Sequence, residues 1–185
     1  MRLFVSVDLP DALADAVADV QEELAGASGL NFVDPEQAHV TLKFLGDVPD
    51  TRVEAVGDAL ETAVERADVE PFEATFEGLG VFPSLEYISV VWLGVGDGSA
   101  ELTRLHEAIE REFVQEHGFG REDHEFTPHV TLARMEHAGG KELVQDVVRE
   151  RDPTVGTVRV SAVRLTESGL TADGPNYETV RAVRL

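Results

Sequence analysis

Cysteine is absent from the 185 residues, and lysine occurs only twice, as Lys43 and Lys141. The lack of cysteine excludes disulfide bonds, thiolate zinc sites and cysteine nucleophiles. No apolar run approaches the 18 or more residues of a membrane-spanning helix. Apolar and polar residues alternate at the start of the chain, which is typical of a strand and not of a targeting peptide. We therefore expect a soluble, cytoplasmic protein, outside any membrane, whose catalysis depends on His, Thr, Arg, Lys and carboxylates.

Positive charge is scarce, because 15 basic residues stand against 36 acidic ones and the formal net charge is −21. All the basic residues except the two lysines are arginines. The acids are spread along amphipathic segments instead of forming a tail. An acidic surface with few lysines suits a salt-rich cytoplasm, where charges are screened within a few ångström. We expect a halophilic protein that must hold any anionic ligand with a local basic cluster.

Segments with helical and strand periodicity alternate along the chain, without a linker or a low-complexity tract. Apolar periodicity predicts helices over 11–24, 50–67, 99–116 and 141–149, with Ser99 as the cap of the third. Strand patterns cover the first ten residues, 31–33, 39–45, 72–81, 87–95, 129–134, 155–166 and 177–185. The order strand, helix, strand, helix therefore occurs in each half of the chain.

No glycine-rich phosphate loop follows any strand, and the two strands around Pro83 resemble a hairpin. Both observations disfavour a doubly wound parallel sheet. We expect an α+β fold in which residues 1–185 form a single bilobal domain. Its two pseudo-symmetric lobes would each contain an antiparallel sheet and helices, with the active cleft between the lobes.

The tetrapeptide HVTL occurs twice, beginning at His39 and, about 90 residues later, at His129. Composition alone predicts roughly 0.005 copies, so the repetition needs a cause. Both copies have strand patterns, and residues two apart on a strand share a face. His39 and Thr41 therefore project together from one strand, and His129 and Thr131 from the other. Two facing lobes would bring the four side chains into one cleft.

Two imidazoles with pKa values near ~6.5 can act as a general acid and a general base near neutral pH. An in-line displacement at phosphorus needs both, one to take a proton from the attacking water or hydroxyl and one to protonate the departing oxygen. Each role contributes on the order of 10² to 10⁴ in rate. Threonine hydroxyls would bind the non-bridging phosphate oxygens. The residues predict an enzyme that needs no metal, with a strained cyclic phosphodiester as its easiest substrate.

Both motifs and their surroundings resemble one family, through the segments HVTLKFLGDV, FTPHVTLAR, RLFVSVDLP, GLGVFPS and VVWLGV. These are the RNA 2',3'-cyclic phosphodiesterases, or 2',5' RNA ligase-like proteins, of the two-histidine (2H) phosphoesterase superfamily. The resemblance implies a bilobal α+β fold and the opening of a 2',3'-cyclic phosphate to a 2'-phosphomonoester without metal or cofactor. The implied partners are RNA ends or nucleotides that carry this group, such as tRNA fragments. A weak, reversible 2',5' ligase activity is also implied.

The resemblance further implies the roles of the four motif side chains. His39 is implied as the proton donor to the leaving 3' oxygen, and His129 as the proton acceptor that activates water. The motifs are identical, so the residues themselves leave this assignment open. Thr41 and Thr131 are implied as phosphate ligands.

Arg134 and Phe44 are further candidates for substrate binding. The family's TLAR sequence implies that Arg134 contacts the phosphate or the nucleotide, and Phe44 is a candidate platform for base stacking. In unbroken strands both would lie on the face opposite the histidines, so their roles require a bend or bulge. Lys43 would lie on the face of His39, where a phosphate contact and a solvated lysine both remain open.

Two other functions remain open. His39 and His129 could ligate zinc or manganese together with an acid such as Asp47, although the chain has no local pair of ligands as in HExxH. A non-catalytic protein could bind RNA ends in the same cleft, although phosphate binding alone favours Arg or Lys. We expect a monomer, because the helices carry no second apolar stripe.

Overall fold

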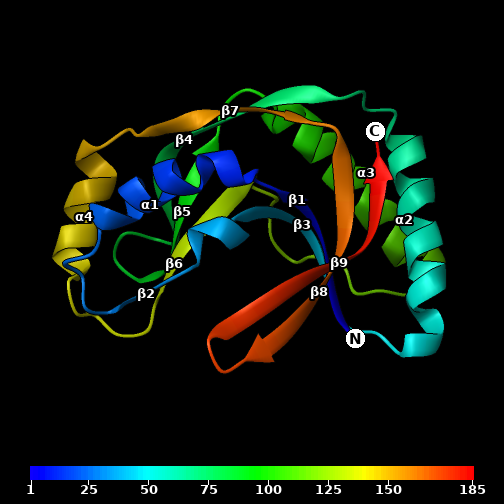
Figure 1. The fold of residues 1–185 in the computed structure, drawn as a ribbon, viewed down its shortest axis with the longest axis horizontal. Helices are drawn as coiled ribbons and strands as arrows, with labels where there is room; N and C mark the ends of the chain where they lie inside the picture. The colour runs from blue at the N-terminus through cyan, green and yellow to red at the C-terminus, as the bar shows by residue number, and fades with distance from the viewer.

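All the strands form one curved antiparallel sheet, with helices packed on it, in the computed structural model, which describes residues 1–185 (Figure 1). The strands are β1 (Arg2–Asp8), β2 (Leu30–Phe32), β3 (His39–Asp47), β4 (Phe72–Pro83), β5 (Ile88–Val95), β6 (His129–Met135), β7 (Thr154–Val160), β8 (Ala162–Thr171) and β9 (Gly174–Arg184). The helices are α1 (Ala14–Glu22), α2 (Val53–Ala67), α3 (Ser99–His117) and α4 (Lys141–Glu150). Short 3-10 turns are η1 (Asp11–Leu13), η2 (Pro35–Gln37) and η3 (Asp50–Arg52). The expected α+β class is confirmed.

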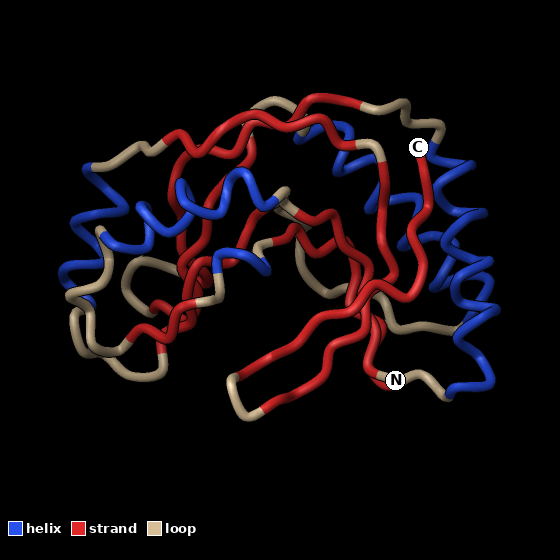
Figure 2. Tube along the Cα trace, in the orientation of Figure 1, coloured by secondary structure: helices blue, strands red, loops and turns tan.

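The strand order is β7-β4-β5-β6-β3-β1-β8-β9, with β2 added to β6. Between β3 and β6 only one residue pair, Val40 with Val130, holds the sheet together. We therefore divide it into a β3 half (β3, β1, β8 and β9) and a β6 half (β6, β5, β4, β7 and β2). These halves correspond to the two expected lobes, joined at the two HVTL strands. The turn end of the β8–β9 hairpin extends away from the helices (Figure 2).

Helices cross from one half to the other. α1 follows β1 in sequence but packs on β6 and β7, whereas α3 follows β5 but packs on β3. α2 packs on β8 and β9, and α4 contacts β4. Consequently α1 and α4 lie together on one side of the molecule and α2 and α3 on the other (Figure 1). Each half of the fold is therefore built from both halves of the sequence.

Apolar side chains from both halves form a shared core of 34 buried residues. A smaller cluster of six buried residues lies beneath α4. Helix α2 shows the underlying pattern, because Val56, Leu60 and Val64 recur at three- to four-residue spacing and are all buried. No helix in the structure combines the length and apolar character needed to cross a membrane.

Three local predictions are wrong in detail. Ser99 is the first residue of α3, and Gly98, in a left-handed conformation with φ of 90°, precedes it in the cap position. The first helix begins with a 3-10 turn and ends at Glu22. The segment 155–166 contains two strands, because the chain leaves β7 in the β6 half and enters β8 in the β3 half at Ser161.

Candidate active site

The two HVTL motifs meet at the junction between the halves. Val40 and Val130 are the second residues of their motifs, and they face each other in an antiparallel pair. Equivalent residues that pair in this way lie on a local twofold axis. Continuing the register by one residue sets His39 opposite Thr131 and Thr41 opposite His129. All four side chains are half-buried and lie on the face opposite the two buried valines, which we call the histidine face.

Each motif contains a β-bulge at its leucine. On β3, Ser6 pairs with Thr41 but the preceding Val5 pairs with Lys43, so Leu42 is an extra residue. On β6, Trp92 pairs with Thr131 and Val91 with Ala133, which makes Leu132 the extra residue. An extra residue shifts the alternation of side chains by one position. The bulges therefore change which of the following residues lie on the histidine face.

Phe44 and Arg134 lie on the histidine face as a consequence. Both are exposed, whereas the residues before them, Lys43 and Ala133, are buried. The requirement for a bulge at both positions is thus met by the structure. The expectation for Lys43 is wrong, because the bulge turns this side chain away from His39 and into the interior, where it is 2% exposed.

Polar side chains from the crossing helices bind the carbonyls of the two bulged leucines. Gln21 of α1 donates from Nε2 to the Leu132 carbonyl at 3.1 Å and to the Val33 carbonyl at 2.7 Å. His106 of α3 binds the Leu42 carbonyl through Nδ1 at 2.8 Å. The Leu132 carbonyl also accepts from the Val33 N–H at 3.0 Å, so Gln21 adds a second hydrogen bond there, while His106 supplies a side-chain partner to the Leu42 carbonyl. Sequence reasoning interprets His106 as a structural or exposed residue of its helix and does not single out Gln21, because positions on predicted helices do not show which strand they approach.

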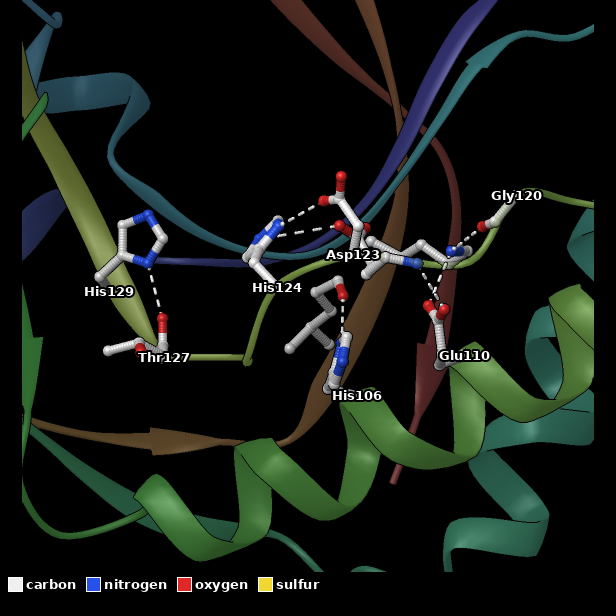
Figure 3. A network of polar contacts seen from close by, with 10 residues as sticks. His106, Glu110, Gly120, Asp123, His124, Thr127 and His129 are labelled. Carbon is white, nitrogen blue, oxygen red and sulfur yellow. Dashed lines mark hydrogen bonds and ion pairs between the residues drawn. The ribbon is translucent and has the colours of Figure 1, made fainter. Parts of the chain in front are cut away.

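The two catalytic candidates have the same ring orientation. His39 Nδ1 lies 2.9 Å from the Gln37 carbonyl, and His129 Nδ1 lies 2.6 Å from the Thr127 carbonyl, as Figure 3 shows for the second pair. A carbonyl only accepts hydrogen bonds, so Nδ1 carries the proton in each ring. Nε2 is therefore the nitrogen that exchanges a proton with a ligand.

Aromatic rings flank each histidine. The ring centroids of Phe4 and Tyr177 lie 5.0 and 5.2 Å from that of His39. Phe82 and Trp92 lie 5.0 and 5.9 Å from His129 in the same way. Gly80 leaves room for the indole, since a Cβ there would lie 2.2 Å from Trp92. These rings restrict access of water to both imidazoles.

Burial lowers the pKa of both histidines, but their charged neighbours differ. For His39, the hydrogen bond to the Gln37 carbonyl and the negative charge of Asp8 raise the pKa, and Arg134 lowers it. Asp8 pairs with His39 across β1 and β3. Its carboxylate accepts from Ser6 Oγ at 3.1 Å and lies 3.5 Å from Arg164 Nε.

No carboxylate counteracts the lowered pKa of His129. Burial is the largest cause and lowers the pKa. The next largest is the hydrogen bond to the Thr127 carbonyl, which raises the pKa, and the positive charges of Arg134, His124 and His39 lower it further. Gly94 occupies the position across the strand pair that Asp8 occupies beside His39. The two imidazoles are thus related by symmetry in position and differ in charge environment.

A pocket of about 310 Å³ adjoins His39 and is lined by residues of β1 and the turn after it, of η2 and of the β8–β9 hairpin. Its wall includes Phe4, Asp8, Arg164 and Tyr177. The volume lies at the lower end of the range for small-molecule sites, but most of the lining residues are polar, and they include the acids Asp8, Asp11 and Glu36. The histidine face therefore continues into a concave surface on the His39 side.

The structure does not bring Asp47 close to His39 and His129, as the alternative metal site would require. Asp47 ends β3 and pairs with Arg2, whereas His39 begins the same strand. No group of three or more His, Cys, Asp or Glu side chains has the arrangement of a metal site.

Comparison with known families identifies this arrangement. The model of the 2'-5' RNA ligase superfamily matches residues 9–170, which include both motifs. The chain belongs to this superfamily. The resemblance inferred from the sequence is confirmed.

Similar proteins carry a consistent description. A relative from Methanothermobacter thermautotrophicus, described as an RNA 2',3'-cyclic phosphodiesterase, is 36% identical, and the match covers 100% of this chain and 99% of the relative. A relative from Archaeoglobus fulgidus with the same description is 37% identical over 98% of both chains. Among solved structures, Thermus thermophilus TT0787 has a TM-score of 0.78 at 28% identity and covers 100% of this chain and 98% of its own. Escherichia coli LigT in complex with 3'-AMP has a TM-score of 0.81 at 22% identity, covering 100% and 97%, and supports the fold alone.

Proposed function

We propose that this protein is a metal-independent RNA 2',3'-cyclic phosphodiesterase that opens the cyclic phosphate to a 2'-phosphomonoester. One observation carries the proposal: the histidine face presents two imidazoles in the same tautomer, related by a local twofold axis, each with Nε2 available for proton transfer. An in-line displacement has two oxygens, entering and leaving, on opposite sides of phosphorus. A pair of histidines related by a twofold axis matches those two oxygens.

His129 is proposed as the base and His39 as the acid. His129 faces positive charges and no carboxylate, which favours its neutral form and lets Nε2 take a proton from water. Asp8 favours the protonated form of His39, whose Nε2 would donate to the leaving 3' oxygen. The P–O3' bond breaks as the water oxygen bonds to phosphorus, so the phosphate remains on the 2' oxygen. The same displacement with a 5'-hydroxyl in place of water would form a 2',5' linkage, and its reverse would cleave that linkage.

The remaining residues of the histidine face are proposed to bind the substrate. Thr41 and Thr131 would donate hydrogen bonds to the two non-bridging oxygens, where negative charge increases in the transition state. Arg134 would supply the positive charge that a phosphate needs in a protein of net charge −21. Phe44, which is 64% exposed, would stack on a base.

The proposed substrates are RNA ends or nucleotides that carry a 2',3'-cyclic phosphate, and tRNA fragments are included among them. The relatives' descriptions support this substrate class. We further propose that the chain acts as one domain over residues 1–185, as a monomer, in the cytoplasm of a halophilic organism. The acidic composition supports the last point.

Turnover of a 2',3'-cyclic nucleotide in molar KCl with excess EDTA tests the function directly. We expect a 2'-monophosphate, identified by phosphorus NMR, at a rate that EDTA leaves unchanged. Activity that appears only after a divalent metal is added would support a metalloenzyme instead. Tight binding of the nucleotide without turnover would support an RNA-end binder.

The pH dependence of kcat/KM should be a bell with its maximum below pH 6.5. The reaction needs one neutral and one protonated imidazole, so the maximum lies midway between the two pKa values, whichever histidine is the acid. Both pKa values are lowered from the ordinary 6.5, mainly by burial. The stability that the neutral imidazoles contribute is lost as the pH falls through these lowered values, so circular dichroism should verify folding on the acid limb. A maximum above pH 7 in folded enzyme would contradict the lowered pKa values of the two histidines.

A further inference from the structure

Lys43 is a buried cation in the strand that carries the first motif. Its Nζ donates to Glu110 Oε2 of α3 at 2.7 Å and to the Gly120 carbonyl at 2.9 Å. The ammonium group thus joins β3, α3 and the segment after α3. Burying a charge costs free energy unless it is paired and hydrogen-bonded. This placement therefore calls for an explanation beyond that of a surface lysine.

The segment held by Lys43 is the loop 118–128, which contains no helix or strand and leads directly into His129. Glu110 holds the loop at a second point, because its Oε1 accepts from the backbone N–H of Glu122 at 2.8 Å. Figure 3 shows Glu110 and Gly120 on one side of this loop, and Thr127 and His129 at its far end. Lys43 and Glu110 thus anchor the loop that carries the carbonyl of Thr127, the partner of His129 Nδ1.

His106 adds a third attachment, one helical turn before Glu110 on the same face of α3. Its ring stacks on Phe126 with the centroids 4.1 Å apart and the planes 6° from parallel. Its Nδ1 binds the carbonyl of Leu42, the bulged residue next to Lys43. One face of α3 therefore connects the bulge of the first motif to the loop that precedes the second.

The segment before His39 is attached to the other motif by Gln21 through the Val33 carbonyl but has no buried ion pair like that of Lys43 and Glu110, and its local structure explains why. The residue equivalent to Lys43 is Ala133. His39 is preceded by the η2 turn, in which the Asp34 carboxylate accepts from the Glu36 N–H at 2.9 Å. That turn fixes the Gln37 carbonyl, the partner of His39, through local contacts. The loop before His129 lacks a comparable turn and is held from outside by Lys43.

We propose that Lys43 is a positioning residue for His129: with Glu110 it holds the loop 118–128 so that the Thr127 carbonyl orients the imidazole. This rests on the proposed function, in which His129 is the base. Lys43 does not contact the substrate, because its side chain is buried on the opposite side of β3. Its loss should therefore lower kcat and leave KM nearly unchanged.

The main test is the double variant K43M/E110L, which replaces the ion pair with apolar side chains of similar size. Such replacements often preserve stability, whereas K43M alone leaves a buried carboxylate without its partner. We expect a folded protein in which kcat falls by about 10- to 100-fold, since a displacement of about 1 Å can have an effect of this size. Amide hydrogen exchange should become faster in the loop 118–128 and remain unchanged in the η2 turn.

An NMR titration of the His129 ring supplies a readout that does not depend on activity. Loosening the loop weakens the hydrogen bond to the Thr127 carbonyl, the contribution that raises the pKa of His129, while the rings of Phe82 and Trp92 on β4 and β5 stay in place and keep the imidazole buried. This loss outweighs the smaller effect of moving His124 away, so the pKa of His129 should fall further below 6.5 and that of His39 should not change. The variant K141M removes the only other lysine and should match the wild type in every measurement.

Three outcomes would overturn the proposal: unchanged kcat and loop exchange in the folded double variant, an effect on KM alone, or a loss of activity that only follows a lower melting temperature. If the wild type opens no cyclic phosphate, the proposed function fails. Amide exchange and the His129 titration would still show whether Lys43 holds the loop and the imidazole.

Discussion

Replacing His39 or His129 with alanine should lower kcat for a 2',3'-cyclic nucleotide by on the order of 10² to 10⁴ in each case. Each variant loses one of the two proposed proton transfers and keeps Thr41, Thr131 and Arg134, the proposed phosphate ligands. KM should therefore change much less than kcat. Initial rates in molar KCl, with the monophosphate product identified, measure both effects.

A matched control and a modified substrate make this test more specific. His137→Ala removes an exposed histidine whose ring accepts only from the Gly139 N–H, and it should leave the rate unchanged. A 3'-thio analogue of the cyclic phosphate has a sulfur leaving group that departs without a proton. It should restore most of the rate to His39→Ala and none to His129→Ala, and the reverse pattern would exchange the two roles.

Raising KCl from 0.1 to 1 M should increase kcat/KM several-fold for a cyclic mononucleotide and tenfold or more for an RNA of several phosphates. A charge of −21 acting at about 20 Å repels one phosphate by about 4 kcal/mol in unscreened water. The Debye length decreases from about 10 Å to about 3 Å over this range. At 1 M KCl most of the repulsion is screened. An RNA carries several phosphates, so its kcat/KM should increase more than that of a mononucleotide.

The comparison of the two substrates separates effects on binding from effects on folding. If salt acted only by stabilising the fold, the rates for both substrates would rise by the same factor, and the melting temperature would rise over the same range of salt concentration. Relief of repulsion should favour the RNA. Association that instead weakens with salt, as expected for a basic RNA-binding surface, would rule out both explanations and the halophilic interpretation with them.

Periodicity and motif content predicted much of the local structure. The helix over 50–67 and the hairpin around Pro83 occur as expected, because one apolar face is enough to define each. The same reasoning placed His39 with Thr41 and His129 with Thr131, since a period of two holds within a short strand. It failed for Lys43, because a pattern of alternation cannot reveal an extra residue that only pairing with a neighbouring strand makes visible.

The sequence by itself determined the chemistry available to this protein. The chain has no thiols, only two lysines, and two histidines that each begin a copy of a motif too rare to be repeated by chance. Tertiary structure decided how these groups are used. The Val40–Val130 pair sets the twofold axis, the bulges turn Arg134 and Phe44 toward the histidines, and strand pairing sets Asp8 beside one imidazole and Gly94 beside the other. These features depend on residues far apart in the chain, whose contacts form only when the sheet and the crossing helices pack together.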